Sequence, residues 1–119
     1  MTDRSLGALP NHHAGETEAF FVLEGTAGFT IDGAPRQIGS GTYVAIPDGA
    51  VHSFHATGAT PARPLILNAP GHMHERFFTE TGYPVDEGTR APAPLEGPPD
   101  VARILAVAAS SGMVILPPA

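Results

Sequence analysis

Short apolar segments separated by turn-forming residues limit what this chain can fold into. The 119 residues include 14 glycines and 13 prolines, which interrupt helices and shorten strands. From Ser5 to Asn68 the apolar runs are only a few residues long and recur at regular intervals. Strands of this length and spacing are typical of a β-sandwich or a β-barrel. We therefore expect an all-β barrel rather than a helical bundle.

Five segments of this region have the residue pattern of strands. They are residues 19–23, 28–31, 43–46, 52–55 and 63–68. The pair Asp32-Gly33 is a strong hairpin signal, because both residues tolerate a positive φ.

The second half of the chain has a different character. A short helix is predicted over residues 74–81, with Phe77 and Phe78 packing on the barrel. Residues 82–99 are rich in proline and glycine, so we expect them to cover the surface without regular structure. We interpret the whole chain, residues 1–119, as one domain with a barrel at about 5–69 and a C-terminal wrap and helix at about 70–119.

A C-terminal helix is predicted to begin after Asp100, a common N-cap residue, and to run to about Ser111. Apolar residues recur along it at helical spacing and form one stripe. Gly112 suits the position that follows a helix C-terminus. Residues 113–116 are predicted to form an edge strand.

Charge and composition exclude several classes of partner. The net charge of -6 disfavours nucleic-acid binding, because an acidic surface repels phosphates. The absence of cysteine excludes disulfides and thiolate metal sites. No signal peptide or membrane-spanning run is evident, so we expect a cytoplasmic protein that binds a small molecule and no membrane.

Two segments contain the residues most suited to chemistry. In the first, Asn11 and His13 share a strand face, and Glu18 follows. In the second, a turn at Pro47-Asp48-Gly49 leads the chain back to His52 at the start of the next strand.

These segments resemble the paired motifs of the cupin superfamily. The first family motif is His-x-His, then Glu, then Gly seven residues after the Glu; Gly25 occupies that last place here. The second is Gly-x5-Pro-x-Gly-x2-His, and residues 41–52 match it. The match covers roughly residues 7–56. It implies a double-stranded β-helix, or jelly-roll, barrel with a short C-terminal helix.

Three further stretches are similar to the quercetin-dioxygenase-like branch of small bacterial cupins. They are residues 18–25, the Pro70-Gly71 turn followed by residues 75–78, and a terminal helix ending in Gly112 that is followed by residues 114–118.

The resemblance implies a divalent transition metal (Fe, Mn, Ni, Zn or Cu) at Asn11, His13, Glu18 and His52. The family has a histidine where this chain has Asn11, whose amide oxygen is a weaker ligand than imidazole. Two outcomes follow. Either His13, Glu18 and His52 hold the metal with Asn11 or water completing the shell, or the barrel is metal-free and the three residues are ordinary buried groups that hydrogen-bond to one another.

Three functions are consistent with these residues. The resemblance implies a metal-dependent, dioxygenase-like enzyme acting on an aromatic or enolic metabolite, with Glu18 as the catalytic proton acceptor. The second is a metal-dependent cyclase, isomerase or lyase of a biosynthetic pathway. The third is a metal-free cupin that binds a small molecule without turnover.

Further predictions concern other residues near the motifs. Phe20 and Phe54 share the parity of Glu18 and His52 and are predicted to line a substrate pocket, although plain core positions are the alternative. Glu16 and His55 are predicted to be exposed. His72 and His74 follow a turn and are predicted to be exposed rather than ligands, although they could line the barrel mouth.

A homodimer is also expected. The segment before the first motif is short for a cupin, which would leave a sheet edge uncovered and open to pairing.

Overall fold

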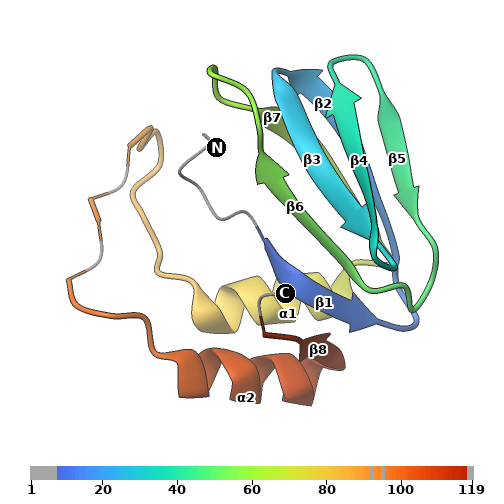
Figure 1. Cartoon of the computed structure of the whole chain (residues 1–119). Coiled ribbons are helices and arrows are strands. Elements are labelled where there is room, and N and C mark those ends of the chain that lie inside the picture. Colours follow the sequence, from blue (N-terminus) through green and yellow to red (C-terminus); the bar gives the residue numbers. More distant parts are fainter. Residues whose placement is uncertain (1–7, 92, 95, 118–119) are drawn as a thin grey trace.

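Two antiparallel sheets and two helices make up the protein (Figure 1). The computed structural model describes residues 8–91, 93–94 and 96–117. The strands are β1 (Ala8–His13), β2 (Thr17–Glu24), β3 (Thr26–Ile31), β4 (Ala34–Gly39), β5 (Tyr43–Ile46), β6 (His52–Ala56), β7 (Arg63–Ala69) and β8 (Met113–Ile115). The helices are α1 (His72–Thr81) and α2 (Val101–Ser111).

The order of strands in the sheets differs from their order in the chain. One sheet has the order β4-β3-β6-β1-β8, and the other has the order β5-β2-β7. The chain therefore crosses repeatedly from one sheet to the other, and strands distant in sequence become neighbours. The structure confirms the all-β, jelly-roll barrel with a short C-terminal helix, and α1, the helix predicted over residues 74–81, packs beside that helix.

The core lies between the two sheets and is built from alternate residues of their strands. Phe20 and Val22 of β2 face Phe29 of β3, and all three are fully buried. The ring of Phe20 lies 5.0 Å from that of Phe29 and 5.1 Å from that of Phe54, measured between centroids. Burying each such side chain contributes about 1.5–3 kcal/mol. This period-2 pattern fixes which face of β2 turns inward, and Glu18 lies on the same face.

The five strand segments predicted from the sequence fall within β2, β3, β5, β6 and β7. The hairpin at Asp32-Gly33 is confirmed, because both residues have positive φ and Ile31 pairs with Ala34 across the turn. Its second strand, β4, has no counterpart among the five predicted segments. The predicted C-terminal edge strand is β8, which pairs only with β1 in the described sheet.

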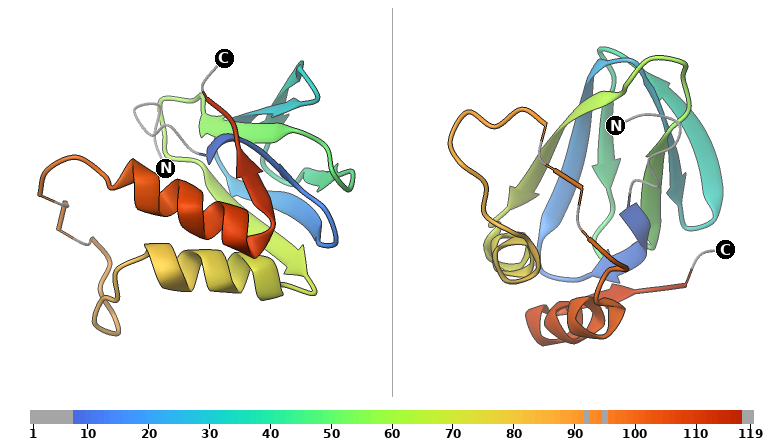
Figure 2. Two further views of the ribbon diagram at one scale, coloured as in Figure 1. Left: turned by 90° about the horizontal axis from the view of Figure 1, so that it is seen from below. Right: turned by 90° about the vertical axis from the view of Figure 1, so that its left-hand side faces the viewer.

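Both helices lie against the same end of the barrel, and they pack side by side (Figure 2). Arg103 of α2 donates to the Glu80 carbonyl at 2.6 Å, and Arg76 of α1 donates to the Ser110 carbonyl at 3.0 Å. The Asp100 cap is confirmed, since its side chain accepts the Arg103 backbone N–H at 3.0 Å. Within the described residues, neither helix has the length and apolar character needed to cross a bilayer.

The edge strand β7 exposes apolar side chains. Leu65, Ile66 and Leu67 are each close to half exposed. The homodimer stays a prediction, because a single chain does not test it.

Gly25 provides a test of this architecture. It has φ +75°, and a Cβ added there would lie 2.6 Å from the Pro61 carbonyl oxygen and 2.9 Å from the Ala62 Cα. Gly33 has φ +81° and no atom within 4 Å of such a Cβ. We expect Gly33→Ala to cost about 1–2 kcal/mol from backbone strain alone. Gly25→Ala should cost about 1–3 kcal/mol more, because the backbone must move.

Denaturant unfolding of the two variants measures the difference. Equal losses of unfolding free energy would contradict the close packing of the β2–β3 turn against the loop before β7.

Candidate metal centre

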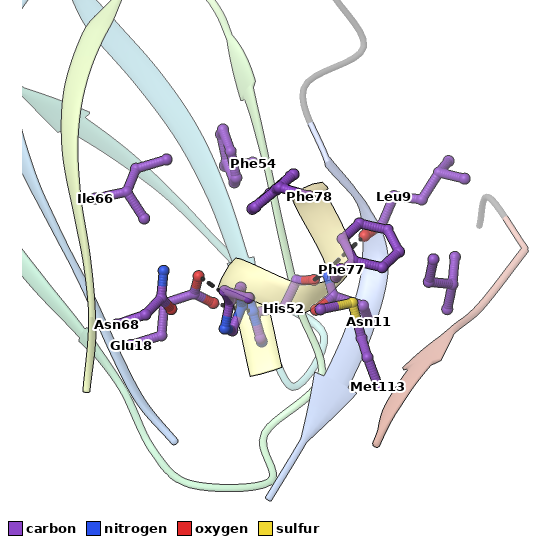
Figure 3. A pocket seen from close by; sticks show the side chains of 12 residues that line it. Leu9, Asn11, Glu18, His52, Phe54, Ile66, Asn68, Phe77, Phe78 and Met113 are labelled. Atoms are coloured by element: carbon purple, nitrogen blue, oxygen red, sulfur yellow. Dashed lines mark hydrogen bonds and ion pairs between the residues drawn. The ribbon is translucent and has the colours of Figure 1, made fainter. Parts of the chain in front are cut away.

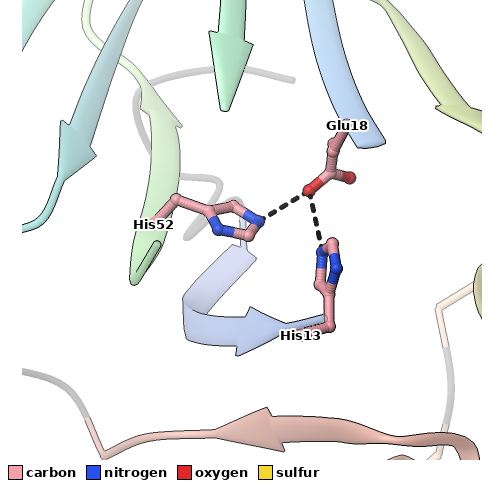
Figure 4. A group of neighbouring side chains, drawn as sticks. All are labelled: His13, Glu18 and His52. Atoms are coloured by element: carbon pink, nitrogen blue, oxygen red, sulfur yellow. Dashed lines mark hydrogen bonds and ion pairs between the residues drawn. The ribbon is translucent and has the colours of Figure 1, made fainter. Parts of the chain in front are cut away.

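His13, Glu18 and His52 form a buried cluster near the base of the barrel (Figure 4). One nitrogen of each histidine and one oxygen of Glu18 all lie within 4.8 Å of one another. Both histidines point at the same carboxylate oxygen, Oε1 of Glu18, with His52 Nε2 at 2.6 Å and His13 Nε2 at 3.4 Å. The structure therefore brings these three residues together as the sequence motifs predict.

The cluster is assembled where three strand ends meet. His13 ends β1, Glu18 lies near the start of β2, and His52 begins β6. Two hydrogen bonds join the turns that precede β2 and β6: the Gly15 N–H donates to Asp48 Oδ1 at 3.1 Å, and the Gly49 N–H donates to the His13 carbonyl at 3.1 Å. These bonds connect the two sequence motifs directly, so each motif positions the other.

His52 is oriented by its backbone contact. Its Nδ1 lies 2.9 Å from the Ala50 carbonyl, which can only accept, so Nδ1 bears the proton. The Nε2 atom is then left to face Glu18. Burial alone would lower the pKa of His52, but its hydrogen bonds to Glu18 and the Ala50 carbonyl, with the charge of Glu18, raise it. Without a metal ion, a proton on Nε2 therefore holds the short contact to Glu18.

The cluster also shifts the pKa values of Glu18 and His13. Burial would raise the pKa of Glu18, but the hydrogen bond from His52 and the nearby positive charge lower it, so the carboxylate is ionised. Burial and the neighbouring His74 lower the pKa of His13 despite the opposing effect of Glu18. A neutral imidazole has a free lone pair, which is the form that binds a metal.

Asn11 lies beside His52 on the paired strand β1 and lines the cavity described below. Its Nδ2 donates to the Leu9 carbonyl at 2.9 Å and to the His52 carbonyl at 3.4 Å. The amide is thus held by backbone groups, and its nitrogen is occupied in structural hydrogen bonds.

Two predictions about neighbouring residues are wrong. Glu16 and His74 are predicted to be exposed, but their exposed fractions are only 5% and 6%; His74 instead lines the cavity, the alternative position predicted for it. The His74 Nδ1 lies 2.6 Å from Glu16 Oε1, and its Nε2 lies 3.4 Å from Glu18 Oε2. Glu16 also accepts the Met73 backbone N–H at 2.9 Å, so it caps the start of α1. This contact explains why α1 begins at residue 72 rather than at 74.

Sheet pairing brings His74 to the cluster. Strand β7 runs antiparallel to β2, so Ala69 at its end pairs with Thr17 at the start of β2. A helix beginning three residues later must lie beside Glu16 and Glu18. No spacing in the sequence indicates this contact, but knowledge of the β2–β7 pairing would have predicted it.

A cavity of about 550 Å³ opens above the cluster (Figure 3). Its apolar wall comes from both the barrel and the C-terminal part of the chain. The apolar lining residues are Leu9, Phe54, Ile66, Phe77, Phe78, Met113 and Ile115. The polar lining residues are Asn11, Glu18, His52, Asn68 and His74.

Only one of the two phenylalanines predicted for the pocket lines it. Phe54 lines the cavity, whereas Phe20 is packed in the core and is absent from the lining. Phe20 lies deeper because β2 is the central strand of its sheet, covered by β3 and β6. His55 and His72 are exposed, as predicted.

The donor set fits a divalent transition metal. Two imidazole nitrogens and a carboxylate oxygen converge in a buried position, and one imidazole has its second nitrogen held by a backbone carbonyl. That outer contact is the arrangement usual for metal-bound histidine. Two histidines and one carboxylate would also suit non-haem iron, a set of protein ligands that does not fill the coordination shell of the metal.

Removing a ligand should remove the metal. We expect His13→Ala and His52→Ala to lower bound metal from about one ion per chain by more than about tenfold, since each deletes one of few donors. His55→Ala is the matched control, because His55 lies on the same strand as His52 but is exposed. Elemental analysis of protein purified without chelator measures the content. Unchanged content in the first two variants would show that the ligands are elsewhere.

The stabilisation that a metal ion gives should depend on pH, because protons and metal compete for the same groups. The raised pKa of His52 means that its pairing stabilises the metal-free fold below pH 6.5, the ordinary histidine value, and that this contribution is lost as pH rises through the raised pKa. Glu18 has a lowered pKa, so its contribution is present above pH 4.5 and is lost as pH falls through the lowered value. A metal ion competes with the proton for Nε2 of His52.

The increase in Tm caused by Mn²⁺ should therefore be larger at about pH 8 than at about pH 6. Calorimetry with and without Mn²⁺ at both pH values measures it. An increase that is the same at both would contradict competition at His52.

Comparisons with known proteins agree with this fold. The cupin domain family matches residues 5–68. No curated protein matches the chain.

Several solved structures are similar. TT1209 from Thermus thermophilus is 22% identical with a TM-score of 0.50, and the match covers 52% of this chain and 59% of that one. A sugar phosphate isomerase from Silicibacter pomeroyi is 25% identical with a TM-score of 0.48, covering 51% and 40%. A predicted oxalate decarboxylase from Thermotoga maritima is 27% identical with a TM-score of 0.47, covering 53% and 58%.

The chain thus spans less than two thirds of the length of each of these structures. The family match, in contrast, includes both motifs and more than half of the 119 residues. The chain therefore belongs to the cupin domain family.

Proposed function

We propose that this cupin is a metal-dependent enzyme that acts on a small aromatic or enolic metabolite, with dioxygenase-like chemistry of the quercetin-dioxygenase-like branch. The observation that supports it best is the convergence of His13, Glu18 and His52 beside a largely apolar cavity. A binding protein needs the cavity, but it has no need of buried metal-type donors at one end of it.

His13, Glu18 and His52 are the residues that would hold the metal. When bound, a divalent transition metal supplies Lewis acidity toward a substrate oxygen and, for a redox-active ion, the means to use dioxygen. The buried position of the cluster keeps bulk water away from its donors. Cytoplasmic location and a homodimer belong to this proposal as expectations only.

Glu18 is the proton acceptor in the proposed reaction. It is the only carboxylate that lines the cavity in the described part of the chain. An enolic or phenolic O–H placed against it would lose its proton to the carboxylate, and the substrate would remain as the enolate or phenolate. His13 and His52 both face Oε1 of this carboxylate, so the negative charge that develops on the substrate would lie beside the metal-type donors.

The cavity favours a ring-bearing substrate. Phe54, Phe77 and Phe78 supply aromatic surface on its wall. Asn68 is directly opposite Glu18 in the β2–β7 pairing, and its Oδ1 is buried without a hydrogen-bond partner among the described residues. An acceptor of this kind suits a second hydroxyl on the substrate. A volume of about 550 Å³ is in the usual range for small-molecule sites.

Oxygen uptake tests the proposal. Protein reconstituted with Fe²⁺, Mn²⁺, Ni²⁺ or Cu²⁺ should consume oxygen with quercetin or a smaller β-diketone such as acetylacetone as the probe. Glu18→Gln should lower the rate by about 100-fold or more, because it removes the proton acceptor. Glu24→Gln is the matched control, since Glu24 lies on the same strand but is exposed. Its rate should be unchanged.

Two outcomes would overturn the proposal. Turnover of the probes under strict anaerobiosis would favour the non-oxidative cyclase, isomerase or lyase. A protein that binds no metal, and whose Tm is unaffected by chelator, would favour the metal-free binding cupin.

A further inference from the structure

His74 has no place in the proposed ligand set, yet its ring is directed into the cluster. It comes from α1, outside the two cupin motifs, and it is buried. Its ring lies 4.7 Å from that of His13 between centroids, in an edge-to-face arrangement. Its Nε2 lies 3.4 Å from Glu18 Oε2, on the carboxylate oxygen that His13 and His52 do not contact.

Glu16 fixes which nitrogen of His74 faces the cluster. The Glu16 carboxylate accepts from Nδ1 at 2.6 Å, as well as from the backbone N–H groups of Met73 and His74. In the neutral ring the proton therefore lies on Nδ1, and the Nε2 lone pair faces Glu18. A lone pair directed at a carboxylate oxygen is an acceptor facing an acceptor. Either a second proton on the ring or a metal ion beside the two atoms satisfies such a contact, so Nε2 of His74 is placed where a metal ligand would be.

The same relation holds for His52, whose Nδ1 is bound to the Ala50 carbonyl and whose Nε2 also faces Glu18. Three imidazole rings thus surround one carboxylate, and two of them have the outer hydrogen bond usual for metal-bound histidine, one to a carbonyl and one to a carboxylate. Asn11, in contrast, has its side-chain nitrogen engaged with backbone carbonyls.

We propose that His74 is a fourth protein ligand to the divalent metal, taking the part that Asn11 leaves open, and that Glu16 positions it. This inference rests on the proposed metal site and adds to it a ligand supplied by the helix. The chain would then offer three imidazoles and one carboxylate.

Metal affinity and a count of bound imidazoles test the inference without reference to activity. Competition titration with a chelator measures the Kd for Mn²⁺, and pulsed electron paramagnetic resonance of the Cu²⁺-loaded protein counts the coordinated imidazoles. Wild type should show three. His74→Ala should show two imidazoles and should weaken Mn²⁺ binding by about 100-fold. Loss of a ligand should cost at least as much affinity as loss of a residue that hydrogen-bonds to a ligand. His72→Ala, an exposed change on the same helix, should leave both values unchanged.

Two further variants separate coordination from a structural role. Glu16→Gln keeps an oxygen that can accept from His74 but removes the charge, so it should weaken binding by about tenfold while three imidazoles remain. The double variant Asn11→His with His74→Ala should regain a third imidazole and much of the affinity, because it restores the donor of the family motif.

The results distinguish this inference from the proposed function. Suppose that His52→Ala abolishes metal binding, whereas His74→Ala has the same Kd as wild type and both proteins show two imidazoles. His74 is then not a ligand, and the site of His13, Glu18 and His52 stands. If wild type binds neither Mn²⁺ nor Cu²⁺, the metal-dependent function fails, and the fourth ligand fails with it. Should His74→Ala not fold, the count in the wild type and in Glu16→Gln still decides: two imidazoles in wild type would overturn the inference.

Discussion

The buried carboxylate of Glu18 is the interaction on which the site depends. It lies near the start of the central strand of its sheet, and histidine nitrogens from β1, β6 and α1 converge on its two oxygens. An ionised carboxylate in a buried position requires compensating hydrogen bonds or positive charge. Each histidine contributes to that compensation, so the three elements are drawn to one point, and the cavity opens beside them.

The hydrophobic core and this cluster are arranged by the same alternation. Phe20 and Val22 turn inward from β2, and Glu18 is two residues before Phe20 on that face. The core therefore fixes the depth of the carboxylate in the barrel. The bonds between Gly15 and Asp48, and between Gly49 and His13, then align the two motifs across the barrel end. The packing of apolar residues and the geometry of the polar cluster are consequently inseparable.

Much of this arrangement could be predicted from the sequence, for local reasons. The strand segments, the Asp32-Gly33 hairpin, the Asp100 cap and the grouping of His13, Glu18 and His52 follow from turn chemistry, residue period and motif spacing. Strand parity does not predict whether Phe20 lines the cavity. Parity identifies the face of β2 that turns inward, but not the residue at which the core ends and the cavity begins. The burial of Glu16 and His74 escapes prediction because their contact joins residues 58 apart through the β2–β7 pairing. Such a contact depends on sheet order, which no local pattern specifies.

The cap that Glu16 provides has a consequence for how the protein responds to its ligands. The helix that it holds also carries Phe77 and Phe78, which line the cavity. A wall of the cavity and a histidine of the cluster are thus parts of one rigid element, anchored by a residue two positions from Glu18. With the coordination proposed for His74, a molecule that draws α1 toward the cluster would raise the affinity for the metal ion. By linkage the ion would favour the molecule by the same factor. Binding in the cavity and binding at the cluster would then each raise the affinity of the other.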